Sequence, residues 1–171
     1  MILIERTGAA AIFPRIALGS FQRLRKAAWS ITKPRSTGAR AICLDEQNRL
    51  ILLKQSYASG WYLPGGAPRS GESKHDTILR ELREEVGMTS YGSIKTLFVV
   101  NQRANNKRDR QTVFLVTGLS FKAKLSLEVE AIGAWPLDEL PGDIHPSTQY
   151  RITRWQEPYR DWTSIPPPDE N

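Results

Sequence analysis

The sequence predicts one α/β domain in which helices pack against a mixed β-sheet. Two observations support this fold class: strand-like and helix-like segments follow one another in mixed order, and two neighbouring strand-like segments form a hairpin. The length of 171 residues and the hydrophobic content of 40% suit a single domain with its own core.

The first half of the domain begins with the predicted hairpin. The apolar run at 38–44 is followed by a polar turn at 45–48 and by a second apolar run at 50–53. Residues 73–86 have helical periodicity, and Gly87 follows as the predicted C-terminal cap.

The second half alternates strands with polar segments. Strands are predicted at 94–101, 111–119 and 128–135, and the first two are joined by a polar connector at 103–110. A single helical turn at 137–140 and a helix at 147–155 complete the domain.

The N-terminal segment differs from the rest of the chain in charge. Residues 1–40 contain eight basic residues against Glu5 alone, whereas the net charge of the whole chain is +6. Residues 13–31 are predicted to form an amphipathic helix with a basic outer face. We favour packing of its apolar stripe on its own domain or on a partner in a homodimer, and binding to a membrane surface is the alternative.

The chain is therefore divided into a basic segment at 1–35, a domain at 36–160 and a Pro-rich tail at 161–171. No apolar run approaches the roughly 18 residues that span a bilayer, so no membrane span is expected. Charged residues interrupt the apolar N-terminus, which argues against a cleaved signal peptide. The single cysteine, Cys43, gives no argument for secretion, and we expect a cytoplasmic protein.

The candidate site combines a glycine-rich loop at 65–71 with the helix that follows it. Glycine allows the loop backbone to approach a ligand closely. On a regular helix Glu81, Glu84 and Glu85 fall within one arc of about 100°. Such carboxylates together with backbone carbonyls suit Mg²⁺, with Mn²⁺ as the alternative. On the helix alone a solvated surface with alternating charges is the preferred interpretation, and it is the loop that favours a site.

Residues 66–88 resemble the signature of the Nudix hydrolase superfamily. Gly66, Glu72 and the run Arg80-Glu81-Leu82-x-Glu84-Glu85-x-Gly87 match its fixed positions. The resemblance implies a Nudix-type α/β/α sandwich around a mixed β-sheet. It also implies Mg²⁺-dependent hydrolysis of a diphosphate in a nucleoside diphosphate derivative, by attack of a metal-activated water.

The same resemblance assigns roles to individual residues. It implies that the metal ligands are Glu81, Glu84, Glu85 and the carbonyl of Gly66. Arg80 is implied to brace the carboxylates. Structural support is expected from Glu72, Gly65, Gly71 and Gly87.

The general base is left open between three residues. Many relatives supply a glutamate from outside the signature helix, and Glu128 matches that place best, with Glu130 second. Glu81 within the signature is the third candidate. Such a base must lie within hydrogen-bond reach of the attacking water.

Substrate contacts are predicted from basic residues near the signature. Arg69 stands where many relatives have a glutamate and is a candidate for binding substrate phosphate, although a surface arginine is the simpler interpretation. The connector adds the candidates Arg103, Lys107, Arg108 and Arg110. A solvated hairpin turn is the alternative for the connector.

The sequence therefore predicts a pyrophosphohydrolase whose substrate is a small nucleoside diphosphate derivative, such as a nucleotide or a nucleotide sugar. No stable nucleic-acid partner is expected. One alternative is a catalytically inactive nucleotide-sensing Nudix module, but every carboxylate of the signature is retained. Another is a pyrophosphohydrolase of RNA 5′ ends that uses the basic N-terminal segment.

Overall fold

The computed structural model describes residues 2–5, 36–104, 107–123 and 125–168. The helix predicted at 13–31 lies outside these residues. The elements are β1 (Ile2–Glu5), β2 (Ser36–Asp45), β3 (Leu50–Gln55), β4 (Gly65–Gly66), α2 (Lys74–Glu81), η2 (Leu82–Val86), β5 (Met88–Ser90), β6 (Ser93–Ala104), β7 (Lys107–Phe121), β8 (Val129–Trp135) and α3 (Pro146–Gln156).

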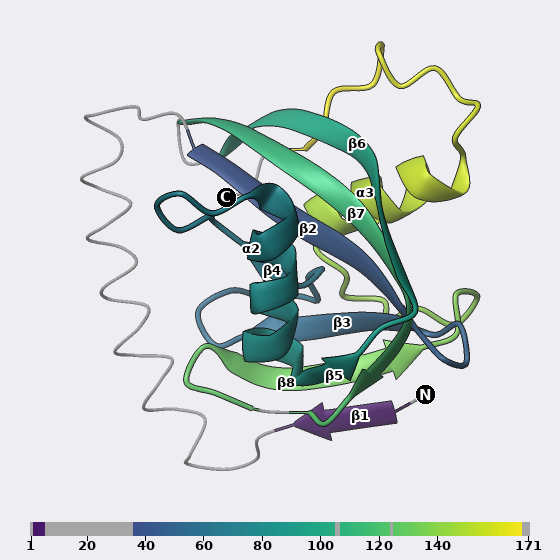
Figure 1. Cartoon of the computed structure of the whole chain (residues 1–171). Coiled ribbons are helices and arrows are strands. Elements are labelled where there is room, and N and C mark those ends of the chain that lie inside the picture. Colours follow the sequence, from purple (N-terminus) through teal and green to yellow (C-terminus); the bar gives the residue numbers. More distant parts are fainter. Residues whose placement is uncertain (1, 6–35, 105–106, 124, 169–171) are drawn as a thin grey trace.

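The strands of the described residues form one mixed sheet (Figure 1). Its order is β1-β8-β3-β2-β7-β5, with β4 paired to β2 and β6 paired to β7. Strands β2 and β7 are parallel, and the other pairs are antiparallel. Along one edge β2 pairs with β7, whereas β3 and β4 share its other edge. Because β3 pairs with the end of β2 and β4 with an earlier part of the same edge, the two glycines of β4 belong to the sheet.

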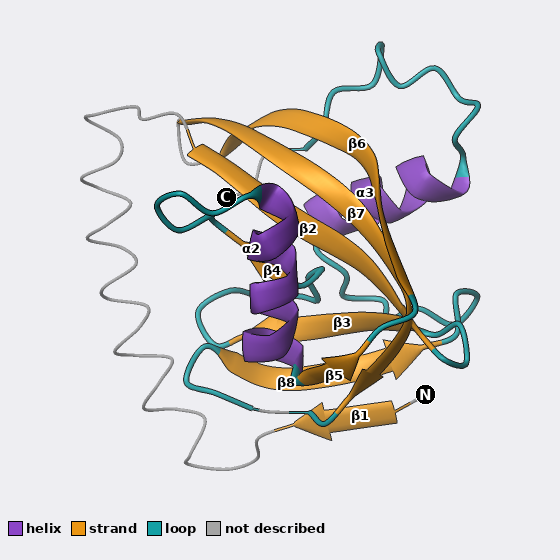
Figure 2. Cartoon of the chain, in the orientation of Figure 1, coloured by secondary structure: helices purple, strands orange, loops and turns teal. Residues whose placement is uncertain are grey.

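Helices cover both faces of the sheet. Successive side chains of a strand point to opposite faces, so Ala41 and Cys43 pack in the apolar cluster of α2, while Ile42 and Leu44 pack in that of α3. In Figure 2, α2 and α3 lie on opposite sides of the sheet. Burial on both faces explains the unbroken apolar runs in the sequence. The predicted α/β/α sandwich is confirmed.

Several predicted elements are found close to their expected bounds. Strands β2 and β3 form the hairpin, with Cys43 opposite Ile51. Strand β8 and helix α3 match the predicted strand at 128–135 and helix at 147–155 within one residue at each end. The segment at 137–140 is a turn in which the Glu139 N–H donates to the Pro136 carbonyl at 3.1 Å. None of the helices in the described part of the chain is long and apolar enough to cross a membrane.

The prediction of a loop at 103–110 was wrong. Strand β6 continues to Ala104 and β7 begins at Lys107, so the connector narrows to 105–106, which lies outside the described residues. Polar residues can extend a strand because pairing uses the backbone, and Gln102 pairs with Asp109 in the hairpin. On the other side of β7, residues 36 and 37 of β2 pair with residues 109 and 110.

The prediction of one regular helix over 73–86 also needs correction. Ser73 is the N-cap, its side chain accepts from the Asp76 N–H, and the α-helix ends at Glu81. The next residues, 82–86, form a wider π-helical turn. Gly87 then takes φ 79°, and its N–H donates to the Leu82 carbonyl, which confirms the predicted cap. π-Helical turns are frequent at functional sites.

Candidate active site

The glycine loop is held against the start of β2. Gly65 pairs with Arg40 and Gly66 with Ala39. The φ of Gly65 is 139°, and a Cβ at this position would overlap the carbonyl of Ala39. Only glycine allows this close approach of two backbones.

The same two glycines lie against the signature carboxylates. A Cβ added at Gly66 would overlap the Glu81 carboxylate. The Gly65 N–H donates to Oε2 of Glu85 at 2.8 Å. The loop backbone and the helix carboxylates therefore meet in one place, as the sequence predicts.

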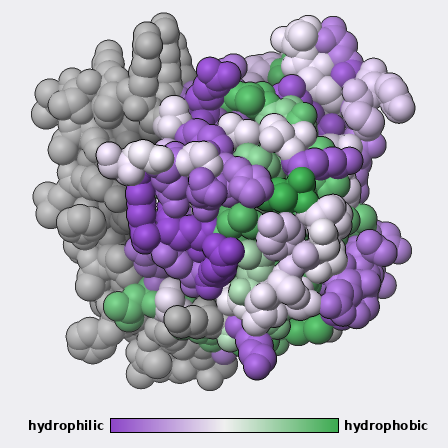
Figure 3. All heavy atoms as spheres, in the orientation of Figure 1, coloured by the Kyte–Doolittle hydropathy of each residue, from purple (hydrophilic) through white to green (hydrophobic). Residues whose placement is uncertain are grey.

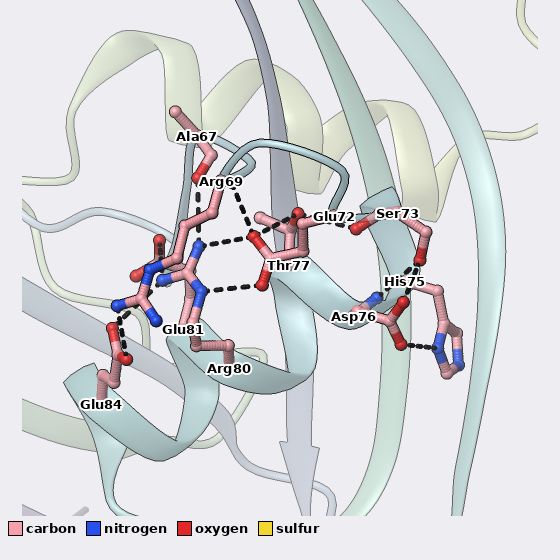
Figure 4. Close-up of polar contacts among 10 residues, drawn as sticks. All are labelled: Ala67, Arg69, Glu72, Ser73, His75, Asp76, Thr77, Arg80, Glu81 and Glu84. Carbon is pink, nitrogen blue, oxygen red and sulfur yellow. Dashed lines mark hydrogen bonds and ion pairs between the residues drawn. The ribbon is translucent and has the colours of Figure 1, made fainter.

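Arg80 joins the carboxylates into one cluster (Figure 4). Its Nε lies 2.8 Å from Glu72 Oε1, and its Nη1 lies 2.8 Å from Glu81 Oε1 and 3.1 Å from Glu84 Oε2. Its Nη2 donates to the carbonyl of Ala67 at 3.1 Å and to Glu72 at 3.0 Å. Arg80 thus connects the loop to the helix.

Glu72 anchors the loop to the first turn of α2. One of its oxygens accepts from the Arg69 N–H at 2.8 Å and from the Thr77 hydroxyl at 3.2 Å. Hydrogen bonds from Arg80, and then from the Arg69 backbone, lower the pKa of Glu72 to about 2. Glu72 therefore stays ionised and keeps Arg80 in place over the ordinary pH range.

Glu85 has a different environment from Glu84, although the two are adjacent. Burial raises the pKa of Glu85 to about 7, and the negative charges of Glu81 and Glu128 act in the same direction. The Gly65 N–H and the positive charge of Arg40 oppose this shift. Glu84, by contrast, has a side chain that is 48% exposed.

Arg40 is a site residue that the sequence analysis missed. It projects from β2, and its Nη1 donates to the carbonyl of Gly65 at 2.7 Å. Its charge also acts on Glu85. The available signal was a single charged residue inside the apolar run 38–44.

Glu128 lies close enough to the signature for its charge to act on Glu85. Its backbone is fixed by neighbouring segments: the Ser56 N–H donates to the Glu128 carbonyl at 2.9 Å, and the Glu128 N–H donates to the Ser126 hydroxyl at 3.2 Å. The Glu128 side chain is exposed, whereas the alternative Glu130 is partly buried within β8. The choice of base between these residues stays a prediction.

The predicted substrate-binding residues divide into two groups. Arg69 lies in the site, with its Nη2 3.0 Å from Glu84 Oε1. Arg110 is exposed on the β6–β7 hairpin, and the side chains of Arg103, Lys107 and Arg108 lie outside the described part of the structure.

The aromatic residues before the loop belong to the core. Trp61 is 4% exposed and packs edge-on against Trp135, with ring centroids 4.4 Å apart. Tyr62 is 9% exposed and stacks on His145. The burial of both side chains indicates that they serve core packing.

The residues present fit a divalent cation by the chemistry of their donors. The carboxylates of Glu81, Glu84 and Glu85 and the carbonyl of Gly66 offer only oxygen, which suits Mg²⁺ or Mn²⁺. Because Gly66 has no Cβ, its backbone can lie directly beside Glu81. Within the described residues, however, no three acidic, histidine or cysteine side chains already stand in a metal-binding group. Glu81 and Glu84 instead contact Arg80.

The surface around this cluster is hydrophilic. Figure 3 shows a continuous hydrophilic area where Figure 1 has α2. The side chains of Arg69 and Glu84 are 66% and 48% exposed, so this part of the site is open to solvent. Small molecules in solution can reach the cluster from that side.

Comparison with known proteins identifies the family. The family model of the NUDIX domain matches residues 34–156. The chain belongs to the Nudix family. The resemblance found in the signature is therefore confirmed, and matching relatives are named as hydrolases of phosphorus-containing acid anhydrides.

Individual relatives agree with this assignment. The Nudix chain is 40% identical over 45 residues to YvcI of Bacillus subtilis (strain 168), an uncharacterised Nudix hydrolase. The aligned residues are 26% of this chain and 28% of YvcI. It is 38% identical over 58 residues to a protein of the same strain provisionally named an 8-oxo-dGTP diphosphatase. This second alignment covers 34% of this chain and 39% of that relative. The chain thus matches less than half the length of either relative.

A solved structure matches over a longer range. The crystal structure of a MutT Nudix hydrolase from Burkholderia pseudomallei is 26% identical and superposes with a TM-score of 0.62. The match covers 70% of this chain and 97% of the other. The Nudix fold thus extends well beyond the signature segment.

Proposed function

We propose that this Nudix chain is a Mg²⁺-dependent pyrophosphohydrolase that cleaves the diphosphate of a small nucleoside diphosphate derivative. The observation that carries the proposal is the meeting of Glu81 and Glu85 with the backbone of Gly65 and Gly66. Membership of the Nudix family supports the reaction class.

Glu81, Glu84, Glu85 and the Gly66 carbonyl would hold the cation, with Mn²⁺ as an alternative to Mg²⁺. When bound, the cation supplies Lewis acidity at the phosphoryl oxygens and lowers the pKa of a bound water. Glu84 is the exposed member of this set, and Glu85 is the enclosed one. The carboxylates thus extend from the solvent surface into the protein.

Arg80 and Glu72 act as positioning residues in this proposal. Arg80 contacts Glu72, Glu81 and Glu84 at once, so it fixes the spacing of the ligand carboxylates. The hydrogen bonds of Glu72 to the loop and to Thr77 fix Arg80 in turn. Such pre-organisation reduces the rearrangement needed when substrate binds.

Phosphate groups of the substrate are bound by basic residues around the cluster. Arg69 is the nearest candidate, since its guanidinium already contacts Glu84. Arg103, Lys107, Arg108 and Arg110 of the β6–β7 hairpin are the further candidates. Guanidinium groups match the geometry of phosphate oxygens.

The test is a substrate panel assayed with Mg²⁺ and with Mn²⁺, in which both products are identified by chromatography. Nucleoside triphosphates, nucleotide sugars, ADP-ribose, dinucleoside polyphosphates and 5′-triphosphorylated RNA should all be included. We expect turnover of at least one small nucleotide that stops when EDTA is added. Turnover that survives EDTA, or none at all with either metal, would contradict the proposal.

Glu128 is proposed as the general base. The support is that its charge acts on Glu85 and that its backbone is fixed by Ser56 and Ser126. We expect Glu128→Gln to lower kcat by about 10²-fold, in the range seen for general bases, and Glu130→Gln to change it little. Loss of turnover in Glu130→Gln alone would transfer the role to Glu130, and retention in both would transfer it to Glu81.

A further inference from the structure

Arg69 neutralises a carboxylate that the proposed function requires for the cation. Its Nη2 lies 3.0 Å from Oε1 of Glu84, while Nη1 of Arg80 lies 3.1 Å from Oε2 of the same group (Figure 4). Both oxygens of the Glu84 carboxylate are therefore bound by guanidinium groups. A cation that binds Glu84 therefore competes with these two guanidinium groups for the same carboxylate.

The two arginines differ in how firmly they are held. The side chain of Arg80 is 15% exposed and also contacts Glu72, Glu81 and the carbonyl of Ala67. The side chain of Arg69 is 66% exposed, and Glu84 is the side-chain contact that it makes among the described residues. Exposed ion pairs contribute little to stability, so Arg69 is the group that can leave.

The backbone of Arg69 is held by two hydrogen bonds to Glu72. Its N–H donates to Oε2 of Glu72 at 2.8 Å, and its carbonyl accepts from the Glu72 N–H at 3.0 Å. Glu72 itself is fixed by Arg80. The guanidinium of Arg69 therefore moves about a fixed point beside the carboxylate cluster.

We propose that Arg69 is an exchangeable counterion that binds Glu84 in the empty site and the diphosphate of the substrate in the loaded site. This proposal rests on the proposed function. When Glu84 turns to a divalent cation, repulsion between like charges drives the guanidinium away from it. A diphosphate brought to the same place offers Arg69 a new anionic partner of matching geometry.

The exchange predicts two effects of opposite sign when Arg69 is removed. Cation binding becomes stronger, because Glu84 no longer has to give up a partner. Diphosphate binding becomes weaker, because one guanidinium is lost from the loaded site. A residue that only bound substrate would give the second effect alone, and one that only supported the loop would weaken both.

The first measurement is Mn²⁺ binding to the whole chain without substrate, followed by the electron paramagnetic resonance signal of free Mn²⁺. Arg69→Gln should lower the Kd about two- to fivefold, as expected for loss of an exposed ion pair. Arg83→Gln is the matched control: it removes the same charge one residue from Glu84, but the Arg83 side chain is exposed and has no ion pair with any described residue. Its Kd should change less than twofold.

The second measurement is calorimetric binding of methylenediphosphonate, a non-hydrolysable diphosphate, at saturating Mg²⁺. Arg69→Gln should weaken binding roughly tenfold, as expected for a charge-assisted hydrogen bond, and Arg83→Gln should leave it unchanged. Thermal unfolding of both variants checks that the loop is intact.

The outcomes separate this proposal from the proposed function. If the native chain binds no Mn²⁺, the proposed function fails and the exchange fails with it. If the native chain binds Mn²⁺ but Arg69→Gln leaves that Kd unchanged, or shifts it no more than Arg83→Gln does, only the exchange is overturned. Unchanged diphosphate binding in Arg69→Gln overturns it as well.

Discussion

Two arginine-centred clusters in this protein are built in opposite ways. Arg80, at the signature, is 15% exposed and contacts the carboxylates of Glu72, Glu81 and Glu84. Arg151, on α3, is 2% exposed and donates to the Ser147 carbonyl at 2.6 Å. The first cluster is open and strongly acidic, and the second is enclosed.

The partners of Arg151 show what an enclosed cluster requires. Its Nη2 donates to Gln102 Oε1 at 3.0 Å, and the amide of Gln102 donates to the buried Asp109 at 3.2 Å. Gln111 donates to the same carboxylate at 2.7 Å. Breaking any of these bonds would leave a buried polar atom with one hydrogen bond fewer, which is costly.

Exposure and charge balance make the cluster around Arg80, rather than that around Arg151, suited to chemistry. Around Arg80 the carboxylates outnumber the arginines, and Glu84 is half exposed, so partners can be exchanged with solvent or a cation. Around Arg151 the bonds hold α3 on β6 and β7. Changes in the first cluster should therefore affect activity, and changes in the second should affect stability.

The largest effect is expected from the signature carboxylates. Glu84→Gln and Glu85→Gln should each lower kcat about 10²-fold or more, because a charged ligand is lost at the reaction centre. The fold should survive, since a glutamine oxygen at position 85 can still accept from the Gly65 N–H. Steady-state kinetics and thermal unfolding test this, with Glu157→Gln on the surface as a control. Normal turnover in either variant would remove that residue from the set of ligands.

The enclosed cluster should show the reverse pattern. Arg151→Met should lower the free energy of unfolding by about 3 kcal/mol, because the buried Ser147 carbonyl and the buried Gln102 amide oxygen lose a shared donor. The kcat/KM of the molecules that remain folded should not change. Urea unfolding followed by tryptophan fluorescence, together with kinetics at low temperature, measures both quantities. A stable variant without activity would invert the comparison.

A substitution of Arg80 in the open cluster can be compared directly with Arg151→Met in the enclosed one. Arg80→Lys keeps the charge but cannot reach Glu72, Glu81 and Glu84 together, so kcat/KM should fall about tenfold. The midpoint of thermal unfolding should fall by less than in Arg151→Met, since the lost bonds are partly exposed. Equal destabilisation by the two substitutions, together with full activity of Arg80→Lys, would contradict the distinction between the open and the enclosed cluster.

The smallest effect concerns the pH dependence of Glu72. Its pKa is lowered to about 2 in the folded protein, against about 4.3 for an ordinary glutamate. A lowered pKa adds stability above the ordinary value, and that stability is lost as pH falls toward 2. The difference in unfolding midpoint between the native chain and Glu72→Gln should be constant above pH ~5 and disappear near pH ~2. A constant difference over the whole range would show that Glu72 acts through packing rather than charge.

Much of the fold follows from local signals in the sequence. Apolar runs bounded by polar turns predicted β2, β3 and β8, because a strand buried on both faces needs apolar side chains throughout. Gly87 marked the end of the signature helix because glycine adopts a positive φ without strain. The prediction failed for residues 103–110, because their polar side chains do not indicate strands. Their backbone nevertheless pairs across the β6–β7 hairpin and with β2.

The identity of the site residues was also present in the sequence. The signature named Gly66, Arg80 and the three helix glutamates, and the structure brings these residues together. The pattern did not reveal Arg40, because its hydrogen bond to Gly65 and the effect of its charge on Glu85 depend on how β2 meets β4.

The chemical groups of the site could be read from the sequence, because residue types, glycine positions and helix ends are local properties. The differences between those groups arise from the packing of the folded chain. Glu84 and Glu85 are neighbours in the chain, but the packing of the helix against β4 leaves the first exposed and encloses the second. The approach of Glu128 to Glu85 likewise arises from contacts between β8, β3 and the signature helix. Such differences depend on residues far apart in the chain, so no local pattern can encode them.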